Sequence, residues 1–118
     1  MAGAVAWSTL VSKLPAKFPG RVGYLPLAPA VEVSGKYSAW LPPLGAGSVP
    51  PASWVRVRMV DNTHFCPAGA ARYAAALLVD LHAEVGLGAT SRSWWDGSWS
   101  SSPVYRSTAG ACPADHPA

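Results

Sequence analysis

The stretch "MVDNTHFCPAG", residues 59–69, decides the fold, because it joins the clearest strand pattern in the sequence to the clearest helix pattern. Just before it, "WVRVRMV" (54–60) alternates apolar residues with Arg56 and Arg58. A period of two predicts a strand, and its arginines predict an edge strand or a face that is partly solvated. Just after it, "PAGAARYAAALLVDLHAEVG" predicts a long helix.

The expected helix has recognisable start and stop signals. Pro67 suits a first helical turn, and Gly86 or Gly88 suits the end. Its apolar residues recur at helical spacing and form one apolar stripe. The members of this stripe are Ala70, Tyr73, Ala74, Leu77, Leu78, Leu81 and Val85.

The amino-terminal half has weaker signals. Apolar residues from Val5 to Leu14 predict a first helix, which Pro15 and the "FPG" that follows would end. The short apolar run 21–30 suggests a buried strand, although Pro26 weakens that interpretation. Residues 31–53 are rich in Pro and Gly and predict a long loop.

The expected order is therefore helix, strand, long loop, strand, helix and tail. Strands that alternate with helices imply an α/β fold with parallel strands, and such sheets bind ligands beyond the carboxyl ends of the strands. Asp61 and the loop 31–53 should then meet on one rim. We expect residues 1–88 to form the domain and the Trp/Ser/Pro-rich residues 89–118 to pack on it as a tail.

Composition narrows the possible functions. A chain of 118 residues predicts one small domain, and its 50% apolar content argues against disorder. The net charge of +3 comes from basic residues that are scattered singly, so nucleic acid is not an expected partner. No stretch has the roughly 18 apolar residues of a membrane span, and the amino terminus is a poor signal peptide.

Cys66 and Cys112 are the only cysteines, and two interpretations of them stay open. A bridge between them would suit an oxidising compartment, whereas two buried thiols would not require one. Asp61, His64 and Cys66 could also bind a metal ion, but a fourth ligand at a recognisable spacing is lacking. We therefore predict no metal ion and no other cofactor.

Asp61 and His64, separated by two residues between a strand and a helix, resemble the last sequence block of the SGNH (GDSL-like) hydrolase family. Gly69 and Ala74 also fit that block, in "VRMVDNTHFCPAGAARYA". The tail, with "GACPADHP", looks like that of actinobacterial extracytoplasmic members. The resemblance implies the carboxyl-terminal portion of a flavodoxin-like three-layer sandwich with a parallel sheet. It also implies ester hydrolysis or acyl transfer outside the cytoplasm, on an acyl ester or glycan substrate.

In that family the histidine is the general base of a serine nucleophile and the aspartate orients it, which would be the roles of His64 and Asp61. The chemistry requires both, because a hydroxyl is a weak nucleophile until an imidazole accepts its proton. A carboxylate on the other ring nitrogen fixes the tautomer. The structural alternative is that Asp61 and Asn62 only form a turn or cap the helix.

The other blocks of the family are missing. No G-D-S motif is present, "DGSWS" (96–100) has a different order and follows the histidine, and Asn62 does not match the oxyanion asparagine. The sequence thus predicts a fragment, a mis-assigned start or half of an enzyme, inactive alone. Its expected partner is the missing amino-terminal half of the domain or a self-associating copy.

Aromatic residues supply two further candidates. Trp40 and Tyr37 lie in the long loop, where they could stack on substrate or pin the loop to the core. The tail carries Trp94, Trp95, Trp99 and Tyr105. These predict either a tail that wraps over the domain or, as an alternative function, a non-catalytic carbohydrate- or cell-wall-binding module.

Overall fold

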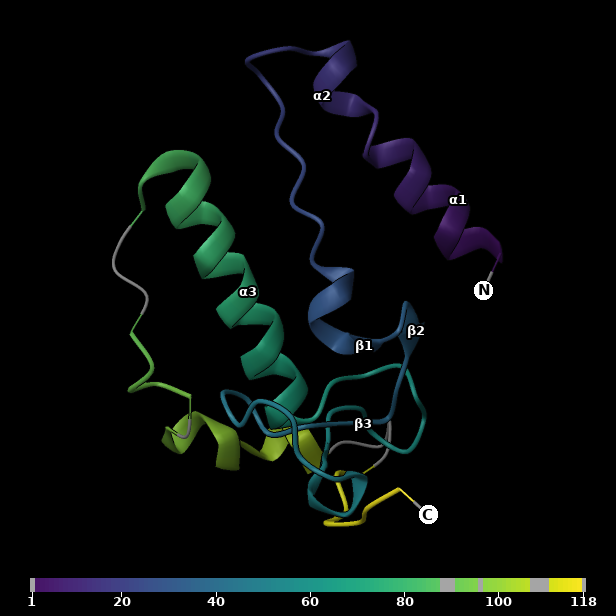
Figure 1. The fold of residues 1–118 in the computed structure, drawn as a ribbon, viewed down its shortest axis with the longest axis vertical. Coiled ribbons are helices and arrows are strands. Elements are labelled where there is room, and N and C mark those ends of the chain that lie inside the picture. Colours follow the sequence, from purple (N-terminus) through teal and green to yellow (C-terminus); the bar gives the residue numbers. More distant parts are fainter. Residues whose placement is uncertain (1, 88–90, 96, 107–110, 118) are drawn as a thin grey trace.

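The structure is a computed structural model that describes residues 2–87, 91–95, 97–106 and 111–117. Figure 1 shows one long helix beside a small body of short strands and turns, with a helical arm at the amino terminus. The helices are α1 Ala2–Val11, α2 Leu14–Lys17 and α3 Pro67–Val85; the strands are β1 Glu32–Val33, β2 Lys36–Tyr37, β3 Trp40–Leu41 and β4 Val55–Arg56. Short 3-10 helices span Ala28–Val31, Pro51–Ser53, Ser98–Ser101 and Pro103–Arg106.

The strands pair only in antiparallel fashion within the described residues. β1 pairs with β2 across a turn at Ser34 and Gly35, which both have positive φ, and β3 pairs with β4. The predicted α/β fold, the carboxyl-terminal portion of a flavodoxin-like sandwich with a parallel sheet, is therefore wrong. Residues 21–30 form no strand, because Pro26 and Pro29 lack the N–H that a ladder needs. β4 pairs instead with β3, which lies inside the expected loop.

The predicted strand 54–60 is present only in part. β4 ends at Arg56, Val57 N–H donates to Ala39 O at 2.8 Å, and Arg58 forms an isolated antiparallel bridge with Phe65. Of the two alternatives, the edge strand agrees with the structure, because β4 belongs to a two-stranded sheet with β3. The arginine face is mostly covered, since the Arg56 side chain is 10% exposed and Arg58 is 8% exposed. Both guanidinium groups have partners that a period of two does not reveal.

The long helix is confirmed at both ends. α3 begins at Pro67, and Gly86 follows it in the left-handed conformation (φ 69°), donating its N–H to His82 O. The apolar stripe is only partly covered: Tyr73, Leu78 and Val85 are 38%, 39% and 64% exposed. The buried helical residues are Gly69 and Ala71, in the first turns, and the rest of α3 extends away from the body (Figure 1).

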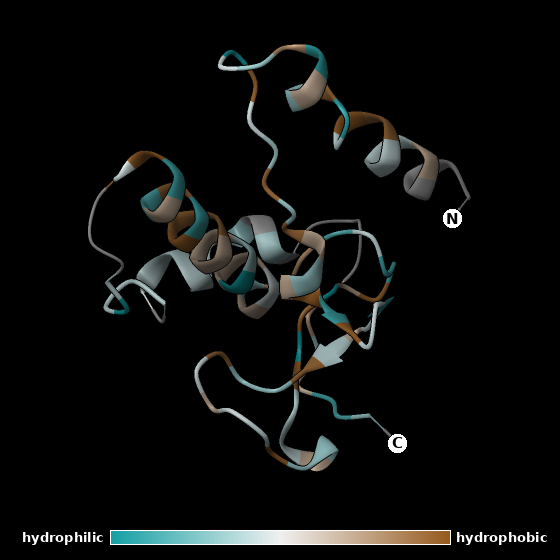
Figure 2. Cartoon of the chain, turned by 45° about the horizontal axis from the view of Figure 1, so that its top comes forward, coloured by the Kyte–Doolittle hydropathy of each residue, from teal (hydrophilic) through white to brown (hydrophobic). Residues whose placement is uncertain are grey.

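The core is small and centred on Val31, Leu41 and Val57. Partly buried Val33, Phe65 and Ala68 pack against these three residues. Figure 2 shows further apolar residues along α3 and along the extended chain between α2 and the 3-10 helix Ala28–Val31. Much apolar surface thus stays outside the core.

The predicted first helix forms as two pieces, α1 and α2, which project from the body as an arm (Figure 1). Trp7 and Leu10 on this arm are 66% and 57% exposed. None of the helices in the described residues is long and apolar enough to cross a membrane.

A disulfide fastens the end of the chain to the body. Cys66, at the start of α3, is bonded to Cys112, which decides between the two interpretations of the cysteines in favour of a bridge. The pair is 46 residues apart, and closing such a loop stabilises the folded state by about 4 kcal/mol on a chain-entropy argument. Val60 N–H also donates to Ala111 O at 3.2 Å, so the described tail residues near Cys112 lie against the motif region.

Gly69 allows α3 to approach the backbone of residue 57 closely. A Cβ at this position would lie 2.1 Å from Val57 O and 3.0 Å from a Phe65 ring carbon. Val57 O is a backbone atom that already accepts the Cys66 N–H, so it cannot move aside easily.

We therefore expect Gly69→Ala to lower the free energy of unfolding by about 1–3 kcal/mol, as overpacking does in other proteins. Chemical denaturation of the oxidised chain measures this. The matched control is Gly23→Ala, because a Cβ there meets nothing within 4 Å. Equal stability of the two variants would contradict the close packing of α3 on residue 57.

Candidate functional site

The D-x-x-H motif forms the tip of a short hairpin. Its legs are joined by two backbone hydrogen bonds, from Met59 N–H to His64 O at 2.8 Å and from Cys66 N–H to Val57 O at 3.0 Å. At the tip, Asn62 donates its N–H to Met59 O at 2.9 Å and has a φ of 60°. Asparagine tolerates this left-handed conformation better than most residues, so the sequence suits the turn.

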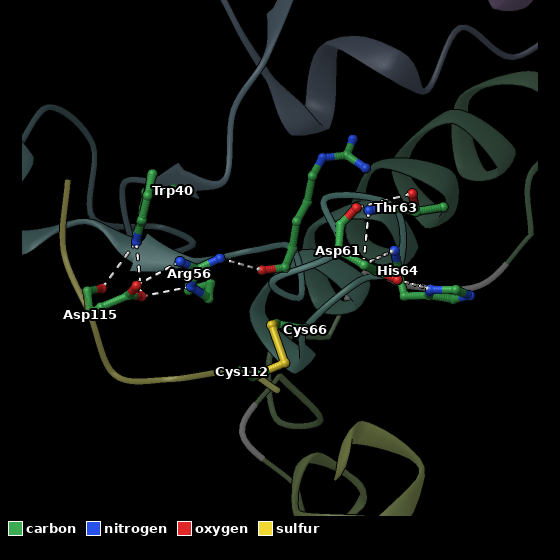
Figure 3. Close-up of a disulfide and its surroundings, with 9 residues drawn as sticks. Trp40, Arg56, Asp61, Thr63, His64, Cys66, Cys112 and Asp115 are labelled. Carbon is green, nitrogen blue, oxygen red and sulfur yellow. Dashed lines mark hydrogen bonds and ion pairs between the residues drawn. A yellow bond between two sulfur atoms is a disulfide. The ribbon is translucent and has the colours of Figure 1, made fainter. Parts of the chain in front are cut away.

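The turn brings the two predicted catalytic side chains into contact (Figure 3). His64 Nδ1 lies 2.6 Å from Asp61 Oδ2. The other carboxylate oxygen, Oδ1, accepts the backbone N–H groups of Thr63 at 3.0 Å and His64 at 3.1 Å. The Asp61 side chain is 28% exposed and the His64 side chain 60% exposed. One oxygen thus holds the backbone of the turn while the other holds the imidazole.

These hydrogen bonds favour the charged form of Asp61. The His64 ring makes the largest contribution, followed by the Thr63 N–H, and together they lower the pKa of Asp61 to about 2. A carboxyl group with a lowered pKa stays ionised until the pH falls through that value. Asp61 is therefore a carboxylate under physiological conditions and can accept a hydrogen bond from the N–H at Nδ1 of the imidazole.

The free side of the ring determines what this pair can do. With Nδ1–H donated to Asp61, the lone pair is on Nε2, on the outer edge of a mostly exposed side chain. Within the described part of the chain, no hydroxyl group bonds to the His64 ring. Thr63 Oγ1 lies beside it in sequence but donates to Asp61 O at 3.3 Å. The arrangement presents an imidazole that is held by a carboxylate at Nδ1 and can accept a proton at Nε2.

Trp40 lies in a second polar cluster, on the other side of the disulfide from His64 in the view of Figure 3. Its Nε1–H donates to Asp115 O and Oδ1, both at 3.1 Å, and the Arg56 guanidinium lies 4.6 Å from its ring centroid. Arg56 also donates to both carboxylate oxygens of Asp115, from Nε to Oδ1 and from Nη2 to Oδ2, each at 2.6 Å. Hydrogen bonds from Arg56 and Trp40 lower the pKa of Asp115 to about 2, and the Asp115 bond raises the pKa of Arg56.

This cluster ties the described tail residues near the carboxyl terminus to β3 and β4. No sequence pattern pointed to Asp115, because its partners Arg56 and Trp40 lie 59 and 75 residues away along the chain. The indole N–H of Trp40 is used within the chain, so the arrangement matches the pinning interpretation of this residue.

Tyr37 lines the same hollow as residues of the motif turn. It is 49% exposed, and the hollow, of about 510 Å³, is also lined by Asn62 and Thr63 of that turn. The guanidinium of Arg58 is 4.6 Å from its ring centroid. Tyr37 therefore stays a candidate for contact with a ligand, at a hollow that Trp40 does not line.

Cys66 is not available as the third ligand of the metal site that the sequence suggested. Cys66 is bonded to Cys112, so its sulfur is not a thiolate beside Asp61 and His64. The described residues contain no other cluster of three or more His, Cys, Asp or Glu side chains that could hold a metal ion.

The tail aromatics pack largely on one another. Trp94 and Trp95 meet edge to face at 6.5 Å, and Trp99 and Tyr105 at 6.2 Å. Trp99 Nε1–H donates to Trp94 O at 2.6 Å. Ser100, in the "DGSWS" segment, donates its hydroxyl to Gly97 O at 2.9 Å, so it is not a partner of His64.

The chain matches no protein-family model, and comparison with curated proteins and with solved structures gives no match either. The functional interpretation therefore depends on the geometry of these residues.

The lowered pKa of Asp61 gives a direct test of the pair. In the folded wild-type chain, carbon-detected NMR should give a titration midpoint of about 2 for the Asp61 carboxyl. His64→Ala should raise it toward the value of about 3.9 that is usual for aspartate, but not fully, because the Thr63 N–H remains. His82→Ala, which removes an imidazole from α3, should leave it unchanged. A midpoint that His64→Ala does not move would contradict the hydrogen-bonded pair.

Proposed function

We propose that Asp61 and His64 are the orienter and general base of an SGNH-type ester hydrolase or acyltransferase. The serine nucleophile and the oxyanion donors come from polypeptide outside these 118 residues, and that polypeptide is the partner of this chain. The proposal rests on the 2.6 Å contact between His64 Nδ1 and Asp61 Oδ2, in a histidine whose side chain is 60% exposed.

The two oxygens of the Asp61 carboxylate have different partners, and this supports the proposal over a purely structural turn. Turn formation needs only Oδ1, which accepts the N–H groups of Thr63 and His64. It does not need a second oxygen on an imidazole, nor a histidine at that position. An orienter needs Oδ2 on Nδ1, because this bond fixes the tautomer and stabilises the imidazolium that forms when Nε2 takes a proton.

The reaction class follows from the resemblance together with the base. His64 Nε2 would take the proton of a serine hydroxyl as the oxygen attacks an ester carbonyl, and would return it to the leaving alcohol. We further propose that the enzyme acts outside the cytoplasm. The Cys66–Cys112 disulfide is compatible with such a location, since bridges persist in oxidising compartments.

A carbohydrate- or cell-wall-binding module remains the alternative. A glycan-binding platform needs ring faces that are free to stack on sugars. Trp94, Trp95, Trp99 and Tyr105 are half-buried and face one another at 83° and 63°. No described contact favours this function, so the proposal stays with the Asp61–His64 pair.

The test combines this chain with the polypeptide encoded next to it. We expect the adjacent coding DNA to specify a G-D-S segment, and co-expression of both parts to give p-nitrophenyl ester hydrolysis. His64→Ala and Asp61→Asn should each lower that rate by about 10²–10⁴-fold, the usual range for lost acid–base catalysis. The control His82→Ala should keep the full rate.

The 118-residue chain alone should show no covalent acyl-serine and no hydrolysis of comparable rate. Strong hydrolysis by the isolated chain that His64→Ala abolishes would contradict the need for an external nucleophile. A full rate in the co-expressed His64→Ala variant would contradict the assigned base.

A further inference from the structure

Arg58 is a buried cation for which the described residues supply no anionic partner. It lies on one leg of the motif hairpin, is 8% exposed, and its Nε–H has no hydrogen-bond acceptor. The ion pairs of the described residues join Arg56 to Asp115 and His64 to Asp61, and none involves Arg58. Burying an N–H donor without an acceptor is costly, so a ligand that offers an acceptor to Arg58 would be favoured.

Aromatic rings cover the guanidinium without using its donors. The Arg58 group lies 4.6 Å from the Tyr37 ring centroid and 5.0 Å from that of Phe65. Such cation–π contacts offset part of the burial cost. The N–H donors of a guanidinium point outward in its plane, however, and ring faces do not satisfy them.

The hollow beside Arg58 has the size and lining of a ligand site. Its volume of about 510 Å³ falls within the roughly 300–1,000 Å³ of small-molecule sites. Polar groups enter it from Arg58, Asn62 and Thr63, all on the motif hairpin. Tyr24 and Tyr73 also line the hollow. The cationic group of Arg58 therefore shares it with aromatic side chains.

We propose that this hollow binds an organic carboxylate, with the carboxylate on Arg58 and an apolar or aromatic body against the tyrosines. A planar carboxylate matches the fork of donors on a guanidinium. One guanidinium balances one negative charge, so a monoanion is favoured over a phosphate dianion, whose second charge would stay uncompensated among apolar walls. The site is separate from the Asp61–His64 pair and does not require that the pair be catalytic.

The wild-type chain gives the first test. Titration with benzoate, benzamide and phenyl phosphate, followed through the backbone amide signals of Tyr37, Asn62 and Thr63, compares probes of similar shape and different charge. We expect benzoate to bind at least about tenfold more tightly than benzamide. Equal affinity for benzamide, or tighter binding of phenyl phosphate, would overturn the assignment.

Variants locate the site. Arg58→Gln should weaken benzoate binding at least about tenfold. Arg92→Gln removes the same charge from an arginine that lies over Trp95, outside the hollow, and should leave the affinity unchanged. If both variants weakened benzoate binding equally, the binding would come from general attraction to a basic protein. That result would overturn the proposal.

Because Arg58 is buried, Arg58→Gln could unfold, which far-UV circular dichroism detects. Tyr37→Leu then takes its place, since Tyr37 is 49% exposed and the change removes one wall of the hollow and its ring contact with Arg58 but keeps the guanidinium. Weaker benzoate binding in that variant supports the proposal, and an unchanged affinity overturns it.

Discussion

The closure of the hairpin over residues 57–66 is the constraint on which the rest of the structure depends. Val57 O accepts the Cys66 N–H, and the same oxygen faces Gly69 so closely that no side chain fits there. Cys66 in turn precedes the first residue of α3 and is bonded to Cys112. The core, the long helix and the described end of the tail therefore meet at one pair of backbone bonds, and the motif turn is held at its tip.

Local sequence signals predicted local structure well, because their causes lie within a few residues. Pro67 and Gly86 mark the ends of α3, and the spacing of Asp61 and His64 brings their side chains together in one turn. Non-local pairing was not predictable in the same way. β4 pairs with β3 inside a segment that has no strand period, and the predicted parallel sheet is wrong for that reason. Asp115 was missed because its partners, Arg56 and Trp40, are distant in sequence.

The two aspartates with strongly lowered pKa values show why such a shift does not identify a catalytic group by itself. Asp115 owes its low pKa first to Arg56, and the pair ties the tail to the β3–β4 strands. Asp61 owes its low pKa first to His64, whose side chain is 60% exposed and whose Nε2 has no hydrogen-bond partner among the described residues. The pKa shift of Asp115 comes from an ion pair in which both carboxylate oxygens bind Arg56 within the chain. The pKa shift of Asp61 comes from a pair in which His64 Nε2 can still accept a proton. The functional proposal rests on this difference.

The tautomer of the His64 ring tests this account most directly. At about pH 9, where a histidine ring is neutral, the proton can be on either nitrogen. Nitrogen-15 NMR correlations between the ring nitrogens and carbons distinguish the two forms. We expect the proton on Nδ1, bonded to Asp61, and the lone pair on Nε2. A ring protonated on Nε2 would leave no outward base and would contradict the assignment of His64.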